Sequence, residues 1–237
     1  HRSDAVVVLS EDLRANVLAK IAPKHQHTVH VIPNFVDSDR ITPRDRMTSY
    51  RDELRIGAEP VVMYAGNVGY SQSLTMMLHA ARQMPEVTFV INGDGAARAE
   101  LERDAVGLSN IRFSGYQPAD RVAEVLATAD VHVVPLRAGL GAVSVPSKTY
   151  SILAAGRPVV AAIDAGTEVT RILADSGAGV SVAPDDPIAF TDALRAMVNS
   201  GSAATEAGAR GRLWVESHVS PARVAHSYLD VIASLGV

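Results

Sequence analysis

Short apolar runs alternate with amphipathic segments along nearly the whole chain. Several of these runs are apolar at consecutive positions, which is typical of strands covered by helices on both faces. Between them lie segments with helical spacing, such as the apolar residues three and four apart in 71–84. This alternation predicts an α/β fold, a Rossmann-like parallel sheet flanked by helices. The predicted strands are rich in β-branched residues and span 5–9, 28–32, 60–66, 87–92, 110–115, 131–135, 158–163 and 178–183.

The regular alternation has breaks near both ends of the chain. Prolines and polar residues interrupt it at 32–46, and two helical segments with no strand between them follow residue 200. We therefore expect three parts, residues 1–43, 44–216 and 217–237. A strand-like run follows almost directly after His1, so we expect the chain to be a fragment of a longer protein.

Composition narrows the class of protein. The 237 residues are 47% hydrophobic and 20% charged, which suits a soluble globular protein with at least one sizeable core. The net charge of −4 gives no reason to expect a nucleic acid or a membrane surface as a general partner. Without cysteine there is neither a disulfide framework nor thiolate chemistry. No apolar run approaches the roughly 20 residues of a membrane span and the start lacks a secretory pattern, so we expect a cytoplasmic protein.

Candidate ligand-binding residues are sought where strands end, because parallel α/β sheets bind ligands at their carboxyl edge. Gly66, Asn67 and Gly69 follow the strand 60–66. Glycines there would let a phosphate approach the backbone, but an ordinary turn would use them equally well. Tyr116 and Gln117 follow the strand 110–115, where they would border a nucleobase or form a plain loop.

A second glycine-rich turn follows the strand 87–92. Gly93, Asp94 and Gly95 open like a dinucleotide fingerprint, but Arg98 stands where the third glycine is required. Asp94 would reach a ribose hydroxyl or cap the next helix, and we favour capping. The broken fingerprint disfavours an NAD-dependent dehydrogenase.

A lone lysine at the start of a helix carries the main functional hypothesis. The loop after strand 131–135 contains Gly141 and Pro146, and Ser147 and Lys148 follow in the first helical turn. A cation there opposes the helix dipole, which is unfavourable unless an anion lies between them. Backbone amides, the serine hydroxyl and the ammonium together predict a phosphate cradle, and a solvated surface lysine is the alternative.

Three histidines lie close together in the sequence 25–30. His25, His27 and His30 have neither cysteine nor a nearby acidic partner, so we favour surface histidines over a metal site.

The order of these motifs resembles a known family. YAGNVGYSQSL, INGDG, IRFSGYQP, ADVHVVPLR and VPSKTYSILAAGRPVVAA succeed one another as in the C-terminal, donor-binding domain of GT-B glycosyltransferases. The likeness is to family-4 retaining enzymes of the bacterial capsule and O-antigen type, and it covers essentially the whole chain. It implies that 1–43 is the tail of an acceptor domain with a linker, 44–216 the nucleotide-sugar domain and 217–237 a crossover helix.

The resemblance also implies the ligands. It points to a UDP-sugar or GDP-sugar donor, a glycan or lipid-linked acceptor bound through a missing N-terminal domain, no metal or other cofactor, and peripheral membrane association of the full-length protein. Ser147 and Lys148 would hold the diphosphate. The nucleotide-sugar site would comprise Gly66, Asn67, Gly69, Gly93, Asp94, Tyr116, Gln117, Gly141, Pro146, Ser147, Lys148 and Ser151.

Two departures from the family pattern concern charge. Val143 and Ser151 stand where many relatives carry two glutamates, the second of which grips the ribose. No basic pair follows the first glycine loop, which leaves Lys148 as the main cation unless Arg137 reaches in. A nucleotide-binding module without catalysis therefore stays open as an alternative. A UDP-N-acetylglucosamine 2-epimerase-like domain would bind a similar ligand and is the other alternative, and the lack of an obvious carboxylate pair disfavours it. The catalytic residues are unknown.

Overall fold

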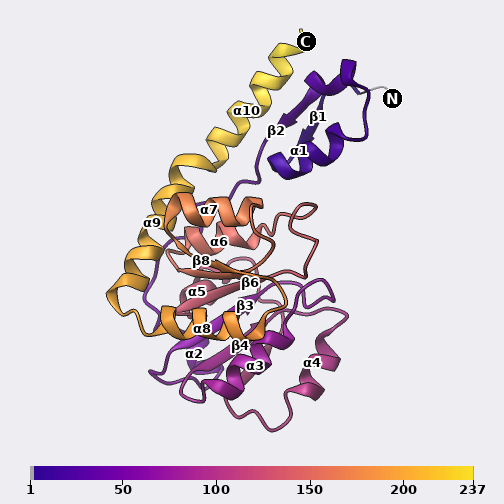
Figure 1. Cartoon of the computed structure of the whole chain (residues 1–237). Coiled ribbons are helices and arrows are strands. Elements are labelled where there is room, and N and C mark those ends of the chain that lie inside the picture. Colours follow the sequence, from indigo (N-terminus) through magenta and orange to yellow (C-terminus); the bar gives the residue numbers. More distant parts are fainter. Residues whose placement is uncertain (1–2, 237) are drawn as a thin grey trace.

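A six-stranded sheet forms the centre of the computed structural model, which describes residues 3–236 (Figure 1). All its strands are parallel, in the order β5-β4-β3-β6-β7-β8. The predicted α/β class with a parallel sheet is therefore confirmed. The strands are β3 (Val61–Ala65), β4 (Thr88–Asn92), β5 (Ile111–Ser114), β6 (Val131–Pro135), β7 (Val159–Ala162) and β8 (Gly179–Val182).

The strand order creates a crevice at one edge of the sheet. From β3 the chain moves outward through β4 to β5, then crosses back to place β6 on the other side of β3. The connections that leave β3 and β6 therefore diverge at the carboxyl edge. Such a switch point is where open α/β sheets bind ligands.

Helices cover both faces of the sheet because its strands are apolar on both sides. Val62 and Tyr64 of β3 pack into the cluster that contains α3, α4 and α8, whereas Val61 and Met63 face the opposite layer. The first layer consists of α3 (Thr75–Gln83), α4 (Arg98–Asp104) and α8 (Pro187–Val198). The second consists of α2 (Ser49–Glu53), α5 (Val122–Ala127), α6 (Lys148–Ala154), α7 (Glu168–Ser176) and α9 (Ser202–His218).

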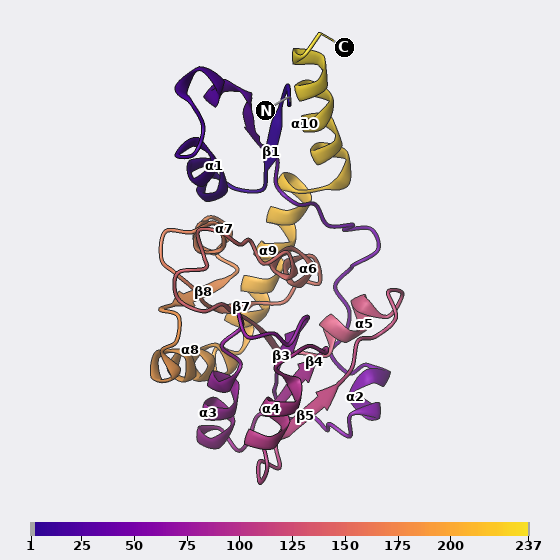
Figure 2. The ribbon, with the colours of Figure 1, turned by 90° about the vertical axis from the view of Figure 1, so that its right-hand side faces the viewer.

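A small N-terminal unit lies next to α7, at one end of the sheet domain (Figures 1 and 2). Its two strands, at the first two predicted positions, pair in parallel. Residues 32–48 connect this unit to the sheet domain, and α10 (Pro221–Ser234) lies beside it in both views. The unit contains β1 (Val6–Val8), α1 (Glu11–Leu18), the 3-10 helix η1 (Pro23–Thr28) and β2 (Val29–Val31).

Val219 and Ser220 separate the last two helices. Ser220 caps α10 by accepting a hydrogen bond from the Arg223 amide, and Pro221 occupies its first position. The Val36 amide donates to the Val219 carbonyl at 3.2 Å, which holds the linker against this break between the helices. The predicted part 217–237 thus begins in the last turn of α9. No helix within residues 3–236 combines the length and the apolarity that crossing a membrane requires.

Candidate functional site

Two adjoining hollows lie at the carboxyl edge of the sheet and share Ala65, Gly66, Lys148 and Ser151. The β5-side hollow, of about 190 Å³, is also lined by Asn92, Tyr116, Gln117, Val122, Val125 and Leu126. The β6-side hollow, of about 370 Å³, is also lined by Asn67, Gln72, Pro135, Leu136 and the segment 144–147. Lys148 therefore lies where the two hollows meet.

The Lys148 ammonium turns inward to the sheet edge. Its Nζ lies 3.8 Å from the centroid of the Tyr64 ring. Burial lowers the pKa of Lys148 to about 7, and no carboxylate of residues 3–236 pairs with it or lines either hollow. A lysine that is desolvated and has no carboxylate partner in an open hollow is a candidate binding element for an anion.

Gly66 makes room for this ammonium. Its φ is +141°, and a Cβ there would lie 2.9 Å from Nζ of Lys148. Gly93 in turn supports Gly66, because a Cβ at Gly93 would lie 1.9 Å from the Gly66 carbonyl oxygen. The loops after β3 and β4 therefore pack backbone against backbone, and Gly93 acts on the site only through its contact with Gly66.

Asp164 holds the first half of the loop after β6. Its carboxylate accepts hydrogen bonds from the amides of Gly139 at 3.0 Å and Gly141 at 2.9 Å. The Gly141 amide is thus bound to protein and does not face a hollow. The second half of the loop, 144–147, lines the β6-side hollow.

A second carboxylate ties the same loop to the neighbouring one. Asp185 accepts from the Ala138 amide at 3.0 Å and from the Ser73 hydroxyl. Its φ is +56°, a conformation that side-chain-bearing residues rarely adopt. The loops after β3, β6 and β8 are therefore joined beside the site.

Tyr116 and Gln117 form a wall of the β5-side hollow. Tyr116 is 61% exposed, and its hydroxyl donates to the Asp94 carbonyl at 3.1 Å. The Gln117 amide donates to the Ser114 hydroxyl at 3.2 Å. These hydrogen bonds hold both side chains in place, and Tyr116 stays accessible to a ligand.

Asp94 does not cap a helix, and the prediction that it does so is wrong. Its carboxylate accepts from the adjacent Gly95 amide at 2.7 Å, while α4 is preceded by Ala97 without a side-chain cap. Arg98 donates to the carbonyls of Gly93 and Ser114 at 2.5 and 2.9 Å. Its guanidinium thus links the ends of β4 and β5.

The structure gathers eight of the sequence-predicted residues at the two hollows: Gly66, Asn67, Tyr116, Gln117, Pro146, Ser147, Lys148 and Ser151. Gly93, Asp94 and Gly141 are not among the lining residues, and Gly69 lines a separate hollow between α3 and α4. Arg137 lines that separate hollow as well and does not join Lys148. Within residues 3–236, no group of three or more metal-ligating side chains is gathered. His25 and His27 are exposed, and His30 is half-buried.

Four polar side chains at the site were not predicted from the sequence: Tyr64, Gln72, Asn92 and Ser144. Asn92 ends a strand with a polar side chain, a signal that was available. Tyr64 gave none, because an aromatic residue inside an apolar strand is indistinguishable from core.

Comparison with known proteins gives the family. Residues 59–200 match the family model described as glycosyl transferases group 1. The chain belongs to this family, and its fold is that of the C-terminal domain of GT-B glycosyltransferases.

The curated relatives are longer than this chain. It is 28% identical over 193 residues to a probable glycosyltransferase WbjE of Pseudomonas aeruginosa, which covers 79% of the chain and 48% of that protein. It is 28% identical over 255 residues to a D-inositol 3-phosphate glycosyltransferase of Xylanimonas cellulosilytica, covering 98% and 57%. The chain spans about half the length of the curated relatives it matches.

Solved structures share the fold at low sequence identity. Sucrose-phosphate synthase of Thermosynechococcus elongatus superposes with a TM-score of 0.82 at 20% identity, over 99% of this chain and 59% of that one. HepE of Anabaena, in complex with UDP and glucose, gives 0.83 at 15% identity, over 98% and 63%.

Proposed function

We propose that this chain binds the diphosphate of a nucleotide sugar at Lys148, and that the whole protein transfers the sugar to a glycan or lipid-linked acceptor with retention of anomeric configuration. The observation that carries the proposal is the unpaired Lys148 ammonium at the junction of the two hollows. A UDP-sugar is the proposed donor and a GDP-sugar the alternative. HepE was solved with UDP-glucose, whereas a Mycobacterium tuberculosis relative, 32% identical over 180 residues, is GDP-mannose-dependent.

The two hollows divide the donor between them. The base and ribose would occupy the β5-side hollow, against the exposed Tyr116 side chain and the hydroxyl of Ser151. The sugar would occupy the β6-side hollow, whose polar side chains other than Lys148 are neutral amides and hydroxyls. The diphosphate then lies at Lys148, where a fixed cation stabilises the negative charge that develops on the leaving group.

We propose that donor binding needs no metal ion. Neither hollow is lined by a carboxylate, the ligand type that Mg²⁺ uses beside phosphates. UDP affinity is expected to be the same with EDTA and with added Mg²⁺, as measured by calorimetry. A Mg²⁺-dependent gain in affinity would contradict this mode of binding.

The absence of lining carboxylates also bears on the two alternative functions, an epimerase and a nucleotide-binding module without catalysis. An epimerase needs an acid and a base beside the sugar, and neither hollow offers a carboxylate for either role. A module that binds nucleotide without catalysis would share this site and differ only in turnover of the whole protein.

We further propose a cytoplasmic location, with peripheral membrane association of the whole protein.

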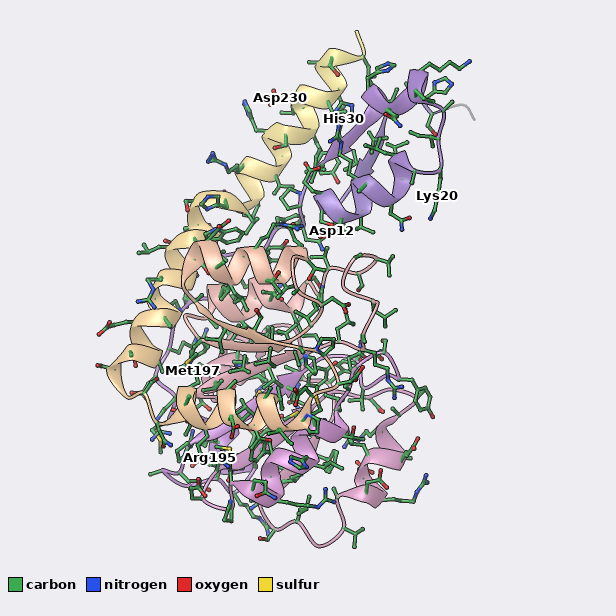
Figure 3. The ribbon with its side chains drawn as sticks, in the orientation of Figure 1. Asp12, Lys20, His30, Arg195, Met197 and Asp230 are labelled. Carbon is green, nitrogen blue, oxygen red and sulfur yellow. The ribbon has the colours of Figure 1, made fainter. Side chains whose placement is uncertain are left out.

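Titration calorimetry with UDP, GDP and NAD tests the binding proposal. We expect UDP to bind the parent and the Lys20→Met control, and to bind Lys148→Met at least 10-fold more weakly. Lys20 is an exposed lysine of the N-terminal unit, on the side away from α10 (Figure 3). NAD binding, or UDP binding that ignores the Lys148 substitution, would overturn the assignment.

A further inference from the structure

We propose that Tyr64 is a positioning residue: its buried ring holds the Lys148 ammonium at the junction of the two hollows, ready for the diphosphate. The ligand in this statement rests on the proposed function above. The contact between the two side chains does not, and it can be tested without any ligand.

The Tyr64 ring is fixed at both ends. The side chain is fully buried in the layer of α3 and α8, and its hydroxyl donates to the Asn67 carbonyl at 2.5 Å. The ring therefore cannot turn away from the sheet edge. Gly66 lies beside it with no side chain to come between ring and ammonium.

The distance between the ammonium and the ring is that of a strong cation–π contact. Nζ lies 3.8 Å from the ring centroid, well inside the roughly 6 Å limit for such contacts. The ring face attracts a cation through its quadrupole and carries no formal charge. It thus orients the ammonium without neutralising it, which a carboxylate in the same place would do.

This arrangement suits capture of an anion. A carboxylate beside Lys148 would pair with the ammonium and repel a phosphate, whereas an aromatic face does neither. Tyr64 from β3 and Tyr116 from the loop after β5 are the titratable side chains that share this region with Lys148, and both are phenols. The Lys148 charge is therefore left for the ligand.

Titration of Lys148 by NMR tests the contact directly. The chain has only three lysines, and Lys20 and Lys24 are exposed, so ¹³C-labelled lysine gives one buried signal and two internal controls. Tyr64→Phe keeps the ring and is expected to leave the pKa of Lys148 nearly unchanged. Tyr64→Leu removes the quadrupole and is expected to lower that pKa by about 0.5 to 1 pH unit.

Fluorinated phenylalanines at position 64 guard against a variant that fails to fold. They keep the shape of the ring, and each added fluorine weakens the ring quadrupole that attracts a cation. We expect the pKa of Lys148 to fall in step with the number of fluorines. A pKa that stays constant through the fluorinated series would refute the positioning role.

A double-mutant cycle links the contact to the ligand. Tyr64→Leu should weaken UDP binding about 5- to 20-fold in the parent and less than 2-fold in the Lys148→Met background. Equal losses in both backgrounds would show a merely structural role and overturn the proposal. If no variant and no parent binds UDP or GDP, the proposed function fails, while the lysine titration still decides the role of Tyr64.

Discussion

The carboxylate of Asp12 and the guanidinium of Arg171 join α1 to α7 through two contacts, at 2.6 and 3.2 Å. Asp12 also accepts from the Glu168 amide at 2.9 Å, the first residue of α7. Thr167, at the N-cap position of α7, makes no side-chain cap of its own. The N-terminal unit therefore caps a helix of the sheet domain, at the boundary where Figure 3 labels Asp12.

Replacing Asp12 by alanine should loosen the N-terminal unit. The change removes an N-cap, which contributes about 1 kcal/mol, and a partly exposed ion pair, which contributes at most about 1 kcal/mol. Amide exchange in β1 and β2 is expected to accelerate several-fold while that in β3 and β4 stays constant. Glu11→Ala, which removes an exposed pair with Arg14 on the same helix, is the matched control. Unchanged exchange in β1 and β2 would show that the two parts are held together elsewhere.

Lys148 makes the stability of the fold depend on pH. Its pKa is about 7 in the folded chain and 10.5 ordinarily, so between these values the unfolded state binds more protons. The free energy of unfolding should therefore rise as pH increases from 7 to 10.5, by about 5 kcal/mol in all, since each pKa unit corresponds to about 1.4 kcal/mol. Denaturant titrations of the parent and of Lys148→Met isolate this lysine from other groups. A rise of the same size in both proteins would contradict the assignment.

Diphosphate binding should be coupled to protonation of the same lysine. An anion beside Nζ raises its pKa, so at pH 8 the complex takes up part of a proton. Calorimetry with UDP in two buffers of different ionisation enthalpy should show uptake in the parent and none in Lys148→Met. Identical apparent enthalpies in both buffers would place the phosphate away from Lys148.

Gly93→Ala should damage both fold and site. The new Cβ would lie 1.9 Å from the Gly66 carbonyl oxygen, at a φ of +146°. We expect a loss of stability of about 3 kcal/mol and weaker UDP binding, because the collision displaces Gly66 from its place beside Lys148. Gly107→Ala is the control. Gly107 also has a positive φ, +89°, but a Cβ there would meet open space, so this variant reports backbone strain without a collision. Similar losses in the two variants would mean that the contact with Gly66 is unimportant.

Asp164→Ala should weaken ligand binding more than it destabilises the fold. Without the carboxylate, the amides of Gly139 and Gly141 lose their acceptor and the loop that supplies 144–147 becomes more mobile. UDP affinity is expected to fall about 3- to 10-fold at a nearly constant melting temperature. Asp192→Ala, on the exposed side of α8, serves as the control. Parent-like affinity would show that the loop keeps its position unaided.

Much of the fold could be predicted from local patterns. Each of the eight predicted strand runs contains one strand, because β-branched runs bounded by turn residues favour strands wherever they pack. The rule that ligands bind at the carboxyl ends of strands led to Gly66 and Lys148. It did so because the direction of parallel strands follows from the chain itself.

The site was less predictable where it depends on neighbours across the sheet. Gly141 and Asp94 follow strands as a binding residue would, yet their polar groups bond to Asp164 and Gly95. Gly93 is required because the Gly66 loop leaves no room for a side chain there, and it lines neither of the two hollows. Hydrogen-bond partners and close backbone contacts of this kind are not encoded in spacing along the chain.

By itself the sequence determined the parallel sheet, its carboxyl edge and the presence of one lysine at a helix start, since these depend on residue type and chain direction. Only the tertiary structure decided where that lysine points. The Tyr64 ring, the bare backbone of Gly66 and the lack of a lining carboxylate come together from separate strands and loops. The charge of Lys148 and its availability to an anion are set by this desolvated surrounding, which no local pattern contains.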